Sequence, residues 1–179
     1  FERLTTDDYR RQFDANVFGV IDTIYAVLPH LKASRGRLAI VSSVLGTLGL
    51  PASSAYCASK HALNGLAESI LYELAPSGVT VTCIMPGLVE SDFRRVDNRN
   101  VPHPERKESS PARLIVPTDR AARAIVDAIH ARKLHAVVTG HGKLIAYLHR
   151  RFPRTFRYLL GRVAAKRIAR AEERLAGHR

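Results

Sequence analysis

The chain has 179 residues, of which 46% are apolar and 25% are charged. These values suit one globular domain with a real core, and no apolar run approaches the ~20 residues that a membrane span requires. The formal charge of +12 is uneven, because residues 1–140 hold 17 Lys or Arg against 14 Asp or Glu, whereas residues 141–179 hold 11 against 2. The basicity therefore belongs to the end of the chain.

The first element that the sequence predicts is one long helix that ends near Lys32. Capping residues and acids at 5–8 precede it, and Ser34-Arg35-Gly36 follows it. Apolar side chains recur through it at helical spacing: Phe13, Val17, Ile21, Ile24, Leu28 and Leu31. A continuous apolar run from Arg37 to Ser43 then predicts a strand buried on both faces.

Helices and strands continue to alternate after this first strand. We expect a loop over 46–53, a helix over 54–75, a strand over 79–85, a long polar loop or lid over 88–116, a helix over 119–133 and a short strand over 136–139. This order predicts an α/β fold with a parallel sheet and flanking helices.

The chain turns helical and basic after Gly142, and Pro153 divides this tail. We therefore divide the chain into a domain over 1–140 and a basic amphipathic tail over 141–179. A solvated helix face is the simplest interpretation of the tail. An anionic membrane surface fits its basic and apolar stripes better than nucleic acid does. We expect a cytoplasmic protein, peripheral at a membrane where the tail binds one.

The pair Tyr56 and Lys60 carries the most specific chemistry. On a helix the two side chains lie one turn apart on the same face, and a cation beside a phenol favours the phenolate. Free tyrosine has a pKa of about 10, so a phenol that transfers protons at neutral pH needs such help. Ser43 lies thirteen residues before the tyrosine at a strand end, although Ser42 is a rival. Together these groups suit proton transfer to or from a carbonyl or alcohol oxygen.

Other reactive residues are interpreted as structural. The two cysteines, Cys57 and Cys83, lack metal-ligand spacing and are expected to be reduced thiols. The eight histidines show no ligand spacing, so no metal site is expected. The segment Gly140-His141-Gly142-Lys143 follows a strand like a phosphate loop, but it lacks the full Walker pattern.

With these residues in place, the sequence resembles the short-chain dehydrogenases/reductases over about residues 5–140. The resemblance rests on Asn16, Ser43, the Tyr-x-x-x-Lys pair at 56–60 and the Pro-Gly pair at 86–87. It implies a Rossmann-like fold and an oxidoreductase that uses NAD or NADP on a small carbonyl or alcohol substrate. Tyr56 would be the general acid/base, Lys60 would lower its pKa and bind the nicotinamide ribose, Ser43 would bind the substrate oxygen, and Asn16 would hold a water linked to Lys60.

The same resemblance assigns the cofactor-binding roles that follow the second strand. Pro86 and Gly87 would pass close to the nicotinamide ring, and the Val89 backbone would bind the carboxamide. Ser91 stands where the family often has threonine, which keeps the hydroxyl.

The resemblance also implies a partial fold and an assembly. The family begins with a glycine-rich turn that binds the pyrophosphate, and this chain begins at a later helix. We therefore expect the carboxyl-terminal two-thirds of such an enzyme, and the alternative is an inactive copy that serves as an interaction or membrane-surface module. The helices at 7–32 and 54–75 are expected to form a homo-oligomer interface through Val20, Val27, Leu63 and Ile70.

Overall fold

The computed structural model describes residues 1–2, 4–91 and 111–176, with the backbone alone for 166–176. The expected long helix is present, but it has three parts: α1 (Thr6–Phe13), a π-helical turn η1 (Asp14–Phe18) and α2 (Gly19–Ser34). Thr5 and Asp8 form a capping box at its start. Arg35 ends it in the left-handed conformation, at φ 48°.

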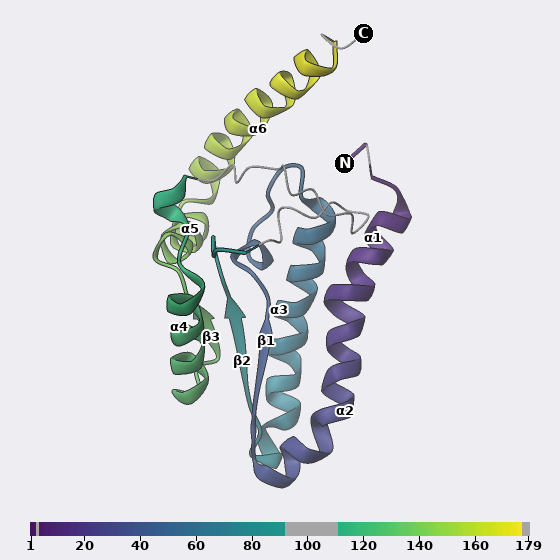
Figure 1. Cartoon of the computed structure of the whole chain (residues 1–179), viewed down its shortest axis with the longest axis vertical. Coiled ribbons are helices and arrows are strands. Elements are labelled where there is room, and N and C mark those ends of the chain that lie inside the picture. The colour runs from purple at the N-terminus through teal and green to yellow at the C-terminus, as the bar shows by residue number, and fades with distance from the viewer. Residues whose placement is uncertain (3, 92–110, 177–179) are drawn as a thin grey trace. The chain divides into compact units, whose positions relative to one another are not determined.

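Three parallel strands form the described sheet, in the order β1–β2–β3 (Figure 1). They are β1 (Arg37–Val41), β2 (Thr80–Met85) and β3 (His135–Val137). The parallel α/β prediction is confirmed, with two differences in extent. The first strand ends at Val41 because Ser43 caps the 3₁₀ turn η2 (Val44–Gly46), and the third strand ends at Val137 because α5 begins at Gly140.

Helices cover both faces of this sheet (Figure 1). On one face α3 (Ser54–Leu74) and α2 pack on alternate strand residues, so that Ile40, Val81 and Cys83 lie in the main core. On the other face α4 (Thr118–His130) packs around the fully buried Ile84. The central strand β2 is therefore buried on both faces, as its continuous apolar run predicts. For β1 this prediction was wrong, because Ile40 is buried whereas Val41 is exposed at the end of the strand.

The expected outward positions for an oligomer interface were partly wrong. Leu63 is fully buried in the main core, and Val20 and Ile70 pack against that core, because α2 and α3 each turn a wide apolar face inward. The large apolar side chains that α2 and α3 do expose include Tyr25, Val27 and Tyr72. The interface itself stays a prediction.

The chain divides into two compact units, residues 1–143 and 144–179. The second contains most of α5 (Gly140–Arg151) and all of α6 (Pro153–Ala176). Its exposed side chains are both apolar, as at Leu144 and Phe152, and basic, as at Arg151. Of the helices that the structure describes, none combines the length and the hydropathy needed to cross a bilayer. Membrane contact stays a prediction.

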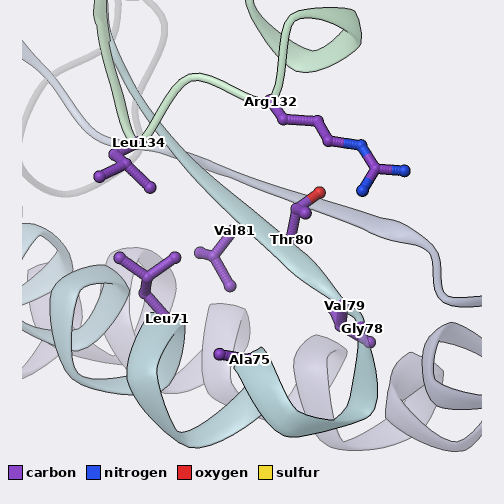
Figure 2. A pocket seen from close by; sticks show the side chains of 8 residues that line it. All are labelled: Leu71, Ala75, Gly78, Val79, Thr80, Val81, Arg132 and Leu134. Carbon is purple, nitrogen blue, oxygen red and sulfur yellow. The ribbon is translucent and has the colours of Figure 1, made fainter.

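Two further parts of the chain complete the fold. The centre of the expected loop over 88–116, residues 92–110, lies outside the described residues. A pocket of about 300 Å³ lies at the amino end of β2, and its lining includes Leu71 of α3, Ala75 just after α3, Arg132 and Leu134 (Figure 2). Ligands of parallel α/β sheets bind at the opposite, carboxyl end of the strands. The functional residues are therefore expected at that end.

Candidate functional site at the carboxyl ends of β1 and β2

The two serines that follow β1 make different hydrogen bonds. The buried Ser42 hydroxyl donates to the carbonyl oxygen of Lys60 at 3.0 Å, which ties the strand end to α3. The Ser43 hydroxyl oxygen accepts from the N–H of Leu45 at 3.1 Å and caps η2. A capping hydroxyl uses a lone pair and keeps its own proton for donation. Of the two serines, Ser43 is therefore the one with a donor to offer a substrate oxygen.

Gly46 allows this strand end to approach α3 closely. A Cβ at this position would lie 2.7 Å from both the Lys60 carbonyl oxygen and Ser42 Oγ, and 2.9 Å from Asn64 Nδ2. Asn64 Nδ2 also donates to the Gly46 carbonyl oxygen at 2.8 Å. The predicted loop after the first strand is thus fixed against the helical turn that carries Lys60.

Tyr56 and Lys60 lie in the first two turns of α3, as predicted. The Lys60 ammonium nitrogen lies 5.7 Å from the centre of the Tyr56 ring. Burial of the ammonium group lowers the pKa of Lys60, and the nearby Cys83 raises it by a smaller amount. A half-buried cation beside the phenol is the arrangement that favours a phenolate, because charges interact more strongly away from bulk water.

Lys60 also donates to the carbonyl oxygen of Val41, the last residue of β1, at 3.1 Å. The neighbouring bond from the Ser42 N–H to the Ile84 carbonyl belongs to the ladder with β2. Strand geometry directs the Val41 carbonyl to the opposite edge of β1. In the described residues β1 pairs with β2 alone, so Lys60 binds an otherwise open strand edge.

Asn16 reaches the same part of α3 from the π-helical turn. Its side-chain amide donates to Ser59 Oγ at 3.0 Å, and the fully buried Ser59 hydroxyl donates to the carbonyl oxygen of Tyr56 at 2.8 Å. A π turn inserts one residue into an α-helix and is frequent at functional sites. The structure therefore links Asn16 to the backbone of Tyr56 through Ser59.

The segment that follows β2 is held along its length. The Pro86 carbonyl accepts from the N–H of Val44 at 2.9 Å. Val116 pairs with the segment in parallel, donating to the Leu88 carbonyl and accepting from the Glu90 N–H, each at 3.0 Å. In such a pairing the N–H and C=O of Val89 point to the other side. Ser91 is exposed at the end of the described segment.

Sequence reasoning missed Ser59, Asn64 and His141, each of which supports the site through a hydrogen bond. Ser59 lies three residues after Tyr56 and Asn64 lies four residues after Lys60, each about one helical turn away, so helical spacing was the available signal. His141 accepts from the N–H of Leu88 at 2.8 Å across 53 positions. Local sequence spacing carries no signal for that contact.

Comparison with known proteins points to one family. The family model described as short chain dehydrogenase matches residues 1–102. The oxidoreductase YusZ of Bacillus subtilis, itself uncharacterized, is 45% identical over 87 residues, which cover 48% of this chain and 31% of that protein. The 3-ketodihydrosphingosine reductase of Bacteroides thetaiotaomicron is 37% identical over 101 residues, or 56% of this chain and 37% of that protein. The chain thus spans about a third of the length of these curated relatives.

Solved structures agree in fold. A short chain dehydrogenase from Burkholderia cenocepacia, crystallised in complex with NADP, superposes with a TM-score of 0.72 at 24% identity, covering 87% of this chain and 60% of that one. A short-chain dehydrogenase from Streptomyces avermitilis superposes with a TM-score of 0.70 at 25% identity, covering 93% of this chain and 66% of that one.

Proposed function

The chain belongs to the short-chain dehydrogenase family, and from that premise we propose that it carries the proton-transfer residues of an oxidoreductase acting on a carbonyl or alcohol substrate with NAD or NADP. The observation that carries the proposal is the bond from Ser42 to the Lys60 carbonyl, with Gly46 packed beside it. This contact joins the strand end with Ser43 to the helical turns with Tyr56 and Lys60. The contact supports the proposal, because a substrate at the carboxyl edge of the sheet would lie near both the strand end with Ser43 and the helix with Tyr56 and Lys60.

Each residue has a role that its contacts support. The Tyr56 phenol gives a proton to the carbonyl oxygen in reduction and takes it back in oxidation. The Lys60 ammonium favours the phenolate through its charge. Ser43 donates its hydroxyl proton to the same substrate oxygen while Leu45 fixes its orientation. Asn16 holds the Tyr56 turn through Ser59.

The residues after β2 fit the nicotinamide end of the cofactor. A carboxamide needs one hydrogen-bond acceptor and one donor, and the backbone of Val89 directs both away from Val116. Gly87 allows the segment to lie close to Thr139 and His141, since a Cβ at position 87 would collide with both side chains. Lys60 would bind the ribose hydroxyls, and Ser91 would add a hydroxyl beyond Val89. When bound, the nicotinamide supplies or accepts the hydride.

The test is Tyr56→Phe in the longest natural polypeptide that contains this sequence. Loss of a general acid/base typically lowers turnover 10²–10⁴-fold, while a phenyl ring preserves the packing. We expect kcat to fall by that factor and cofactor affinity, measured by NADPH or NADH fluorescence, to change little. Tyr25→Phe is the matched control, because Tyr25 is 71% exposed on α2. A Tyr56→Phe enzyme with more than about a tenth of wild-type kcat would refute the assignment.

A further inference from the structure

His141 contacts the proposed cofactor segment from a distant part of the chain. It lies in the first turn of α5, and its Nε2 accepts the backbone N–H of Leu88 at 2.8 Å. An imidazole nitrogen that accepts a hydrogen bond carries no proton, so the ring is neutral with its proton on Nδ1. The bond therefore exists in only one protonation state of the ring.

The segment after β2 and the first turn of α5 lie close together at Gly87. A Cβ on Gly87 would lie 2.4 Å from His141 Nε2 and 2.4 Å from Thr139 Oγ1. The Thr139 hydroxyl is buried and lies 3.4 Å from the same ring nitrogen. His141 and Thr139 thus pack directly against the turn after β2. Val116 holds the same segment through the Leu88 carbonyl and the Glu90 N–H.

We propose that His141 is a positioning residue, whose unprotonated Nε2 holds Leu88 so that the adjacent Val89 backbone is presented to the nicotinamide carboxamide. Protonation places a hydrogen on Nε2. This N–H can no longer accept from the Leu88 N–H, and it donates to the Thr139 hydroxyl oxygen instead. The Leu88 N–H is released, while the Leu88 carbonyl and the Glu90 N–H stay bonded to Val116. The link to the carboxamide rests on the proposed function, whereas the link to Leu88 does not.

The electrostatic surroundings favour the neutral ring. Burial lowers the pKa of His141 from its ordinary value of 6.5. Among the described residues, the ionisable groups on the two bonded segments are Glu90, two residues beyond Leu88, and Lys143, two residues beyond His141, and both are exposed. The turn η2, whose Val44 lies beside Gly142, has no ionisable side chain. The contact is therefore intact at neutral pH and is lost as the pH falls below 6.5 through the folded pKa.

The structural arm of the test follows the Leu88 amide by ¹⁵N NMR and hydrogen exchange between pH 4.5 and 8 in the 179-residue chain. In the wild type we expect one titration with a midpoint below 6.5 and a loss of exchange protection at its acid end. His141→Gln replaces Nε2 with an amide oxygen that accepts at every pH, so its Leu88 amide should be protected throughout. The Val116 amide, which donates to the Leu88 carbonyl, reports that the segment stays in place, and the Cys83 amide in β2 reports that the fold persists. An identical pH response of Leu88 in wild type and His141→Gln would overturn the proposal.

The functional arm measures cofactor KM and kcat separately in the longest natural polypeptide. We expect KM for the cofactor to rise about fivefold from pH 7.5 to pH 5 in the wild type, the effect of one lost hydrogen bond, and to stay level in His141→Gln. A Leu88 titration without a change in KM would overturn the positioning role alone. The proposed function fails by a different result, an active Tyr56→Phe enzyme.

Discussion

Gly46→Ala tests whether close packing between β1 and α3 holds the site together. The added Cβ would stand 2.7 Å from the Lys60 carbonyl oxygen and from Ser42 Oγ, where ordinary contacts begin at 3.4 Å. The shortfall of about 0.7 Å falls on the backbone of a helix, which cannot rotate away as a side chain can. The turn η2 must therefore move away from α3.

The free-energy cost follows from what that movement breaks. Overpacking of a well-packed interior costs about 1–3 kcal/mol. The bonds from Ser42 to the Lys60 carbonyl and from Asn64 to the Gly46 carbonyl lengthen from 3.0 and 2.8 Å, at about 1 kcal/mol each. These terms overlap, so we expect unfolding to become about 2–4 kcal/mol easier.

Urea unfolding of the 179-residue chain, followed by circular dichroism, measures this change. Gly65→Ala is the matched control on α3, because its Cβ would meet no atom within 4 Å. In a helix interior that substitution should stabilise by about 0.5–1 kcal/mol. If Gly46→Ala unfolds at the wild-type urea concentration, the described contact between η2 and α3 does not exist in solution.

Two further substitutions test buried polar groups. Burial raises the pKa of Cys83 from 9.0 to about 11. Between these pH values the thiol is neutral in the folded chain and ionised in the unfolded chain. The free energy of unfolding should therefore fall by up to about 3 kcal/mol as the pH rises from 9 through 11. Urea titrations should show a flatter alkaline limb for Cys83→Ala, and superimposable curves would contradict the shift. Asn16→Asp removes the donor to Ser59 Oγ, whose own proton is bound to the Tyr56 carbonyl, so it should cost about 1–3 kcal/mol at pH 7. That loss should shrink below about pH 4, where a neutral Asp can donate again, and a loss independent of pH would contradict it.

Much of the fold was predictable because its signals are local. Apolar spacing and terminators placed the helices near α2, α3 and α4, and continuous apolar runs marked the strands. The Tyr56–Lys60 pair was predictable for the same reason, since both residues lie on one helix. The sequence did not predict that Leu63 faces the core, because both faces of α3 carry apolar residues.

The supporting contacts could not be predicted because they join distant residues. The bond between His141 and Leu88 depends on how the turn after β3 meets the turn after β2. The bond between Ser42 and the Lys60 carbonyl depends on Gly46, because a Cβ at this position would collide with α3. The sequence does not show this requirement, since α3 meets Gly46 only in the folded chain. Burial of the Lys60 ammonium likewise results from the packing of separate elements.

The contact of Asn16 with α3 depends on the one extra residue that the π-helical turn adds to the first helix. The N–H of Gly19 bonds to the carbonyl of Asp14, five positions back, so one residue more than an α-helix requires lies within this turn. Deleting a residue here would restore regular α-helical bonding and remove a local defect. Because the extra residue is held within one wide turn, α1 and α2 would keep their faces, and the change would fall on the residues of the turn itself. Asn16 is one of these residues, so its bond to Ser59 depends on the extra residue, whereas the packing of α2 does not.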